Sequence, residues 1–270
     1  MKIGVLGCGG RVGKQLVTAL YYNDPTCLGG CLESYDSSIL GQDIGNIINT
    51  GPLGVAVSDN AEEVFSTCNV LIDFTSAAAT LEHVQLAAKL NKPIVIGTTG
   101  FTDKQEHIIK QCSKQIAIVK SSNMSLGVNV LFKLVECAAK VLNKELYDVE
   151  IIEKHHKHKK DAPSGTALTL GNLIAKAREE DLQNIIHSHR KGISNGRESN
   201  KIAFHAVRGG SIIGEHSVLF IGEGEIIELK HTALSRDVFV NGAIKAAKWI
   251  VGKPSGFYSF NEIINQLNQE

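Results

Sequence analysis

The sequence lacks an excess of charge of either sign. Across 270 residues, 28 basic and 28 acidic side chains give a formal net charge of zero. A dedicated nucleic-acid-binding protein normally carries a basic excess, so we expect no nucleic-acid partner. The basic run Lys154–Lys160 is a local exception and needs its own explanation.

Long apolar runs are also missing. No stretch is apolar for the roughly 20 residues that a membrane span requires, so no membrane association is expected. The first residues, Met1–Leu6, lead directly into a glycine cluster, whereas a signal peptide needs a longer apolar segment and a cleavage site. We therefore expect a cytoplasmic protein.

Cysteine pairs of the Cys-x-x-Cys type are absent as well. Most of the six cysteines lie in apolar or helix-like runs. In a chain without a secretion signal they are expected to be reduced, small core residues. A redox role for Cys27 and Cys31 stays open as the alternative.

The first half of the chain alternates short apolar segments with helix-like ones. Expected strands are Lys2–Gly7, Thr26–Glu33, Val70–Phe74, Pro93–Gly97 and Ile116–Lys120, and expected helices are Arg11–Tyr22, Ala77–Leu90 and Thr102–Lys114. Continuous apolar strands separated by helices indicate a parallel sheet covered on both faces. The pattern predicts an α/β domain with a doubly wound, Rossmann-type sheet.

The second half has a different pattern. A long helix is expected at Ser125–Asn143, where Leu126, Val130, Leu134, Ala138 and Val141 recur at helical spacing. The expected strands that follow are Tyr147–Glu153, Lys201–Val207, Glu215–Ile221 and Glu225–Thr232, with helices at Thr166–Ala177 and Val238–Val251 and a surface loop at Ser188–Asn200. Because strands outnumber helices, we expect an α+β domain with a mixed open sheet. The predicted domains are residues 1–125 and 126–235, with 236–270 packing back on the first.

A glycine loop follows the first expected strand. Gly7, Gly10 and Gly13 have the spacing G-x-x-G-x-x-G, with Arg11 and Val12 inside the loop. Such a loop lets backbone N–H groups approach a pyrophosphate at the N-terminus of the following helix. Its place between a strand and a helix is the context that a dinucleotide site requires.

An acidic residue, Glu33, closes the second expected strand about 20 residues after the loop. We expect its carboxylate to accept hydrogen bonds from the adenosine ribose, although a solvated acid at a strand end is the plain alternative. The next residues, Ser34 and Tyr35, carry no positive charge, so Arg11 is the nearest cation for a 2′-phosphate.

Two further loops follow strands of the same sheet. They are Asp73–Ser76 and Gly97–Phe101, the latter reading G-T-T-G-F. Ligands of open α/β sheets bind outside the carboxyl ends of the strands, which favours both loops as cofactor contacts. Ordinary turn chemistry explains either loop equally well.

The segment Glu153–Thr166 concentrates reactive side chains, with three histidines and four lysines. Ser164 or Thr166 is suited to cap the helix that follows. The N–H groups of Gly165 and Thr166, with Lys159 nearby, would form an anion site for which a carboxylate is a natural ligand. A basic surface loop without a ligand is the alternative.

A metal site at His155, His156 and His158 is not favoured. The flanking lysines would repel a divalent cation, and cysteine or carboxylate ligands at suitable spacing are missing nearby. Histidines in a basic loop are instead suited to binding dicarboxylates and donating protons near neutral pH. We therefore expect no metal.

Taken together, the motifs resemble those of the dihydrodipicolinate reductase family. They are G-x-x-G-R-x-G from Gly7, D-F-T from Asp73, G-T-T-G-F from Gly97, S-N-x-S-x-G-V-N from Ser122, E-x-H-H-x-x-K-x-D-A-P-S-G-T-A from Glu153, R-G-G-x-I-x-G-E-H from Arg208 and S-R-x-x-F-x-x-G-A from Ser235. The resemblance covers essentially the whole chain. The long histidine–lysine motif is highly specific, whereas the glycine loop alone is not.

The resemblance implies a function and its residues. The family uses NADH or NADPH to reduce a cyclic imine dicarboxylate, 4-hydroxy-tetrahydrodipicolinate, in lysine and diaminopimelate biosynthesis, and its members are homotetramers joined through the sheets of the second domain. By motif position His155 would be the general acid and Lys159 the cationic donor beside the substrate. His156, Ser164, Gly165, Thr166 and Thr99 would bind substrate, and the cofactor would be bound by Gly7, Gly10, Arg11, Val12, Gly13, Glu33, Phe74, Thr75, Gly97, Thr99, Ser121, Ser122, Met124 and Arg236.

Three positions depart from the family pattern. Ser34 and Ser76 replace arginines that are common after the ribose-binding acid and after D-F-T, and Met124 replaces a common phenylalanine. We therefore predict that NADH is used at least as well as NADPH. Another two-domain dehydrogenase of a small dicarboxylate or amino acid, or a ligand-binding protein without turnover, is the alternative function.

Overall fold

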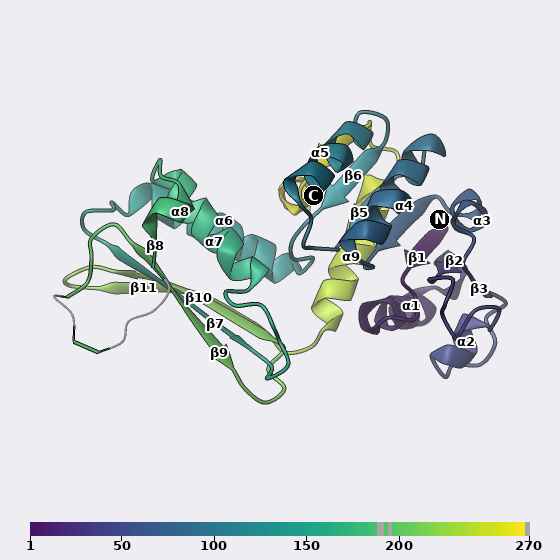
Figure 1. The fold of residues 1–270 in the computed structure, drawn as a ribbon, viewed down its shortest axis with the longest axis horizontal. Helices are drawn as coiled ribbons and strands as arrows, with labels where there is room; N and C mark the ends of the chain where they lie inside the picture. Colours follow the sequence, from purple (N-terminus) through teal and green to yellow (C-terminus); the bar gives the residue numbers. More distant parts are fainter. Residues whose placement is uncertain (188–191, 194–195, 268–270) are drawn as a thin grey trace. The chain divides into compact units, whose positions relative to one another are not determined.

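A computed structural model describes residues 1–187, 192–193 and 196–267 (Figure 1). The chain divides into two compact units. Residues 1–125 and the segment from Asp237 onward form the first, and residues 126–236 form the second. Among the described residues, no helix has both the length and the apolar character needed to cross a membrane.

The first unit contains a seven-stranded sheet in which every pairing is parallel. In spatial order its strands are β12 (Gly256–Tyr258), β6 (Ala117–Lys120), β5 (Ile94–Ile96), β4 (Val70–Asp73), β1 (Ile3–Leu6), β2 (Leu28–Leu32) and β3 (Val57–Ser58). The strand order reverses between β1 and β4. Ligands of such sheets bind at this reversal, outside the carboxyl ends of the strands.

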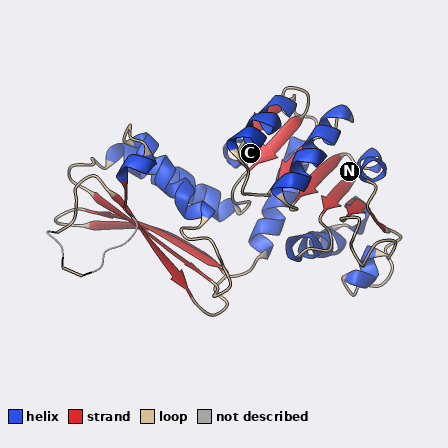
Figure 2. Cartoon of the chain, viewed as in Figure 1, coloured by secondary structure: helices blue, strands red, loops and turns tan. Residues whose placement is uncertain are grey.

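Helices cover both faces of this sheet (Figure 2). One layer contains α1 (Arg11–Asn23), α9 (Asp237–Ile250) and α10 (Phe260–Leu267), and the other contains α3 (Ala61–Thr67), α4 (Ala77–Lys89) and α5 (Asp103–Cys112). Alternate strand residues enter the two cores, with Ile72 in the first and Leu71 in the second. The predicted Rossmann-type, doubly wound sheet is therefore confirmed.

The second unit contains a five-stranded mixed sheet. In spatial order its strands are β11 (Ile226–Ala233), β10 (Gly214–Ile221), β7 (Asp148–His155), β9 (Ile202–Arg208) and β8 (Ile186–His187). Neighbouring strands are antiparallel from β11 to β7 and parallel from β7 to β8. The helices α6 (Leu126–Val141) and α7 (Gly165–Ala177) pack on one face, and the short α8 (Leu182–Ile185) packs beside α7, so the predicted mixed sheet is also confirmed.

Along β7, the buried face changes from apolar side chains to ionisable ones. Val149 and Ile151 point toward the helices and are fully buried. Side chains of a strand alternate between its two faces, so Glu153 and His155 continue on this same helix-covered face. Both are buried, at 1% and 9% exposure. The apolar core of the second unit thus ends in a buried cluster of ionisable groups.

Some expectations were incomplete. The helix α6 is confirmed, but Leu126, Val130 and Leu134 lie on its more exposed side, because a second apolar stripe that includes Leu131 and Val135 faces the sheet. The short elements α2 (Ile44–Ile47), α3, α8, α10, β3, β8, β12 and the 3-10 turn Pro25–Cys27 were not predicted. The expected loop at 188–200 falls partly outside the described residues.

Candidate active site

The register of the second sheet assembles a polar cluster from three strands. Glu153 on β7 lies opposite His216 on β10, and His155 lies opposite Arg208 on the other neighbour, β9. Gly214 leaves room for the His155 ring, because a Cβ added there would lie 3.3 Å from Nε2. Residues separated by more than fifty positions in the sequence are thereby brought onto one face.

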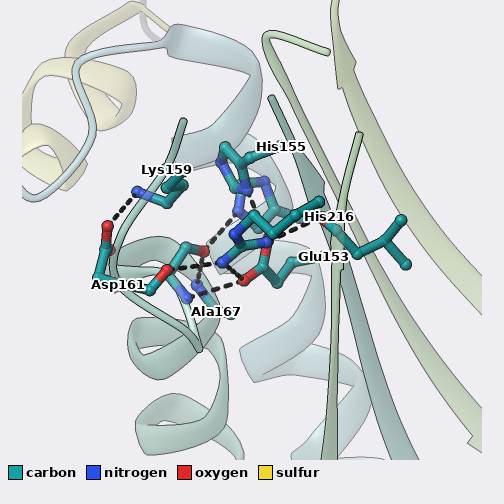
Figure 3. A network of polar contacts seen from close by, with 9 residues as sticks. Glu153, His155, Lys159, Asp161, Ala167 and His216 are labelled. Atoms are coloured by element: carbon teal, nitrogen blue, oxygen red, sulfur yellow. Dashed lines mark hydrogen bonds and ion pairs between the residues drawn. The ribbon is translucent and has the colours of Figure 1, made fainter. Parts of the chain in front are cut away.

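The carboxylate of Glu153 is the centre of this cluster (Figure 3). Its Oε2 lies 2.5 Å from Nδ1 of His155. Arg208 donates through both terminal nitrogens, at 2.8 Å to Oε2 and 2.7 Å to Oε1. The backbone N–H of Ser164 donates to Oε1 at 3.1 Å. One buried carboxylate therefore joins β7, β9 and the start of α7.

These partners keep Glu153 ionised. Burial by itself raises the pKa of this carboxyl, but the hydrogen bonds from His155 and Arg208 outweigh burial and lower the pKa to about 2. The same contact raises the pKa of Arg208. A buried charge is costly unless it is paired and hydrogen-bonded, and the two-pronged arginine contact meets both conditions.

Two buried histidine rings lie beside the carboxylate. The rings of His155 and His216 meet edge to face, with centroids 5.1 Å apart. Burial, and then the electrostatic effect of the nearby His155, lower the pKa of His216 to about 3. His216 is therefore neutral near pH 7, and its Nε2 lies 3.0 Å from Oγ of Ser164.

The N-terminus of α7 forms the second side of the cluster. Ser164 is the N-cap, and its Oγ accepts the backbone N–H of Ala167 at 3.2 Å. Gly165 and Thr166 follow as the first residues of the helix. Among the described residues nothing would contact a Cβ at Gly165, so the backbone is open to a ligand there. This geometry suits an anion.

The loop between β7 and α7 supplies positive charge. The ammonium of Lys159 pairs with Asp161 at 2.9 Å, and the backbone oxygen of Asp161 accepts from Arg208 at 2.6 Å. Burial, and then the nearby charge of Arg236, lower the pKa of His156. Arg208 therefore binds both the Glu153 carboxylate and the backbone of Asp161, the residue that pairs with Lys159.

The glycine loop of the first unit is packed too tightly for side chains. Gly7 has a φ of +77°, and a Cβ at Gly13 would lie 2.0 Å from the backbone oxygen of Gly7. Gly10 is the N-cap of α1, and no side chain caps this helix end. The Glu33 carboxylate accepts the backbone N–H of Gly9 at 2.6 Å, which fixes it beside the loop.

A cavity of about 400 Å³ lies beside this loop. It is lined by Gly7, Gly10, Leu32, Glu33, Ser34, Phe74, Thr75, Ser76, Ala79 and His83. The fully buried Asp73 fixes one wall, because its carboxylate accepts from Thr75 at 2.6 Å and lies 2.8 Å from Nδ1 of His83. The Phe74 ring lies against the backbone of Gly97, where an added Cβ would be 2.2 Å away. The cavity is thus lined by residues at the ends of β1, β2 and β4, and Gly97 after β5 packs against Phe74 of its wall.

Comparison with known proteins agrees with this geometry. Residues 1–124 match the model for "Dihydrodipicolinate reductase, N-terminus", and residues 127–264 match that for "Dihydrodipicolinate reductase, C-terminus". The chain belongs to the dihydrodipicolinate reductase family. It is 44% identical to the 4-hydroxy-tetrahydrodipicolinate reductase of Psychrobacter arcticus, over 98% of this chain and 95% of that one. Identity to the Pelobacter propionicus enzyme of the same name is 41%, over 98% of both chains.

Solved structures show the same relationship. The dipicolinate-bound dihydrodipicolinate reductase from Paenisporosarcina sp. TG-14 is 27% identical, with a TM-score of 0.73 over 96% of this chain and 97% of that one. A myo-inositol dehydrogenase from Corynebacterium glutamicum is 12% identical, with a TM-score of 0.59 over 99% and 93%. The second likeness concerns the fold alone.

The residues expected from the resemblance to the dihydrodipicolinate reductase family are divided between the units. His155, His156, Lys159, Ser164, Gly165, Thr166 and Arg236 lie in the second unit, and the remaining predicted residues, including Thr99, Arg11 and Val12, lie in the first. Ser121 and Ser122 directly follow β6. The Met124 side chain is buried in the core of the first unit.

Three important residues of the second unit were not singled out from the sequence. Glu153, Arg208 and His216 all belong to motifs that carry the family resemblance, but no role was expected for them. Glu153 and His155 are separated by two positions, which places both on one face of a strand. Arg208 and His216 are the first and last residues of R-G-G-x-I-x-G-E-H, and only the strand register shows that both reach Glu153.

Proposed function

We propose that this chain is a nicotinamide-dependent 4-hydroxy-tetrahydrodipicolinate reductase of lysine and diaminopimelate biosynthesis. The observation that carries the proposal is the buried Glu153, which joins a histidine to a helix N-terminus suited to a carboxylate. The first unit would bind NADH or NADPH, and the second would bind the dicarboxylate. Family membership supports both parts.

The residues of the first unit fit a dinucleotide. Gly7, Gly10 and Gly13, with Arg11 and Val12, would hold the pyrophosphate at the N-terminus of α1. Glu33 lies in the cavity wall and would accept the ribose hydroxyls. The nicotinamide end would be held by Phe74, Thr75, Gly97, Thr99, Ser121, Ser122 and the backbone at Met124. When bound, the cofactor supplies a hydride.

The residues of the second unit fit a dicarboxylate. Ser164, Gly165 and Thr166 would bind one carboxylate through the first turn of α7, with His156 as a further contact. Lys159 supplies a cation at the end of a flexible side chain, and Asp161 holds that side chain at 2.9 Å. Substrate can replace Asp161 as the partner of the ammonium because Asp161 is largely exposed.

His155 would donate the proton that the reaction consumes. The 4-hydroxyl group leaves as water together with one ring hydrogen, and the hydride and one proton are added to the ring. Glu153 accepts a hydrogen bond from Nδ1 of His155, so the second nitrogen, Nε2, is the one that exchanges its proton with substrate. Lys159 would stabilise the negative charge that develops as the hydride arrives.

We also propose a homotetramer joined through the second sheet. Leu219 and Ile221 lie on the sheet face opposite α6 and α7 and are half-buried. On this same face Glu215 pairs with Lys154 at 3.3 Å and Lys230 at 3.0 Å. Apolar and paired polar groups together suit contact with another copy of the chain. Light scattering after size exclusion measures the assembly.

A cytoplasmic location is part of the proposal. All six cysteines are free thiols, and four of them are buried. Reduced, unpaired cysteines suit a reducing compartment. Fractionation of cells that express a tagged copy tests the location.

A coupled assay tests the proposed reaction. Fresh product of dihydrodipicolinate synthase is added to the enzyme with NADH, and in a parallel run with NADPH. We expect cofactor oxidation that saturates with the amount of that product. Without such oxidation, the proposal of another dehydrogenase or of a binding protein without turnover would replace this one.

A further inference from the structure

The hydroxyl group of Ser164 has two buried neighbours. One is the backbone N–H of Ala167, which lies 3.2 Å from Oγ and can only donate. The other is Nε2 of His216, at 3.0 Å. Ser164 and His216 are almost fully buried, at 2% and 3% exposure. The direction of the hydroxyl proton therefore depends on the protonation of the His216 ring.

The structure distinguishes the two neutral forms of that ring. Nδ1 of His216 is buried and has no hydrogen-bond partner among the described residues. A proton on Nδ1 would leave a buried N–H without an acceptor, and such orphaned donors are rare in folded proteins. A proton on Nε2 instead donates to Oγ of Ser164. The low pKa of His216 excludes the doubly protonated form near pH 7.

The consequence concerns the Ser164 proton. With Nε2–H and the Ala167 N–H both donating, the two lone pairs of Oγ are occupied. The hydroxyl then donates to a third group, and no acceptor for it lies among the described residues. Ser164 is the N-cap of α7, so an anion bound at this helix N-terminus would supply such an acceptor.

We infer that His216 is a positioning residue that makes the Ser164 hydroxyl a hydrogen-bond donor to a substrate carboxylate. This inference rests on the proposed function, since it requires a carboxylate at the N-terminus of α7. In the opposite ring form the hydroxyl would donate to His216, and the carboxylate would meet an oxygen lone pair. His216 thus acts through Ser164 without touching substrate.

A double-mutant cycle tests the inference. The variants are Ser164→Ala, His216→Leu and the pair together, and the measured quantity is the Kd for pyridine-2,6-dicarboxylate by calorimetry. A hydroxyl–carboxylate hydrogen bond is charge-assisted, so Ser164→Ala should weaken binding about 10-fold to 100-fold, and His216→Leu, which leaves the hydroxyl free to turn, should weaken it by less. The double variant should lose no more than Ser164→Ala, because His216 acts only through that hydroxyl. Additive losses would overturn the inference.

Two further variants separate positioning from packing. The side-chain amide of His216→Gln can donate from the position of Nε2, so we expect it to recover most of the affinity that His216→Leu loses. His231 lies one strand farther out, opposite His216, and His231→Leu is the matched control with unchanged affinity. Equal losses in His216→Gln and His216→Leu would contradict the inference.

A wrong role for His216 and a wrong proposed function would give different results. If the wild-type enzyme oxidises NADH with the synthase product but the cycle is additive, only the role of His216 is wrong. If the wild-type enzyme neither oxidises NADH with that product nor binds the dicarboxylate, the proposed function itself is wrong. NADH affinity, measured by fluorescence, should be unchanged in every variant.

Discussion

Glu153 and His155 are joined by a hydrogen bond of 2.5 Å inside the second unit, on the face of β7 that the helices cover. Only one residue separates them in the sequence, and it points to the opposite face of the strand. The same carboxylate accepts two hydrogen bonds from Arg208 and one from the start of α7. The orientation of the proposed proton donor and the position of the proposed carboxylate site therefore depend on one side chain.

Glu153→Gln should remove the charge while keeping the size of the side chain. We expect kcat to fall by roughly 10²-fold, because a neutral amide orients and stabilises a protonated His155 less well. The Kd for NADH should be unchanged, since Glu153 belongs to the second unit. Steady-state kinetics and a fluorescence titration measure the two quantities. A kcat within twofold of the wild type would show that the carboxylate has no part in the chemistry.

Gly214→Ala should disturb His155 directly. The added methyl group would lie 3.3 Å from Nε2, so the ring would have to shift by a few tenths of an ångström. A displaced reacting group can cost up to about 10²-fold in rate, so we expect a clear loss of kcat. Gly209→Ala is the matched control, because no described atom lies within 4 Å of a Cβ there. Similar kinetics in the two variants would contradict this role of Gly214.

The stability of the protein should depend on the charge of Glu153 in acid. Its pKa is about 2 in the folded chain and 4.5 as the ordinary value. The contribution of this charge to the free energy of unfolding is therefore complete above pH 4.5. It is lost as the pH falls from 4.5 toward 2, a difference of roughly 3 kcal/mol. Denaturant unfolding of wild type and Glu153→Gln at one protomer concentration measures it. We expect the two curves of unfolding free energy against pH to converge in acid, and parallel curves would be inconsistent with the low pKa.

Cofactor choice should follow Ser34. This residue lines the cavity of the first unit, and its hydroxyl donates to Asp36 at 2.5 Å, so the site offers a negative charge where a 2′-phosphate would need a positive one. We expect kcat/KM with NADH to equal or exceed that with NADPH. Ser34→Arg should raise the ratio of kcat/KM with NADPH to kcat/KM with NADH about tenfold. Ser38→Arg, farther along the same loop, should leave that ratio unchanged. A strong wild-type preference for NADPH would refute this prediction.

Helices and strands with a periodic apolar pattern can be predicted from the sequence better than short strands or the packing of a helix on its sheet. Apolar segments such as Val70–Phe74 and the helix that includes Leu131 could be recognised because burial imposes a period on the chain. The two-residue β3 and three-residue β12 are too short to carry a period, and they were missed. In α6 two apolar stripes compete, and the sequence does not say which one faces the sheet.

The site could be predicted where chemistry is local in the sequence. His155, Lys159 and Ser164 fall within one motif, and the glycine loop has its own spacing. Arg208 and His216 are remote in sequence, and their roles depend on strand register, which a single sequence does not specify. The low pKa of Glu153 arises from those remote contacts, so it could not be anticipated.

If His155 donates the proton, assisted by Lys159, a single-turnover measurement reveals it most directly. Enzyme saturated with NADH is mixed with fresh synthase product, and the loss of NADH absorbance is followed in wild type, His155→Ala and Lys159→Ala. We expect a rate about 10²-fold to 10⁴-fold lower in each variant, with NADH affinity unchanged. Wild-type rates in His155→Ala, or an equal loss of NADH binding in both variants, would contradict it.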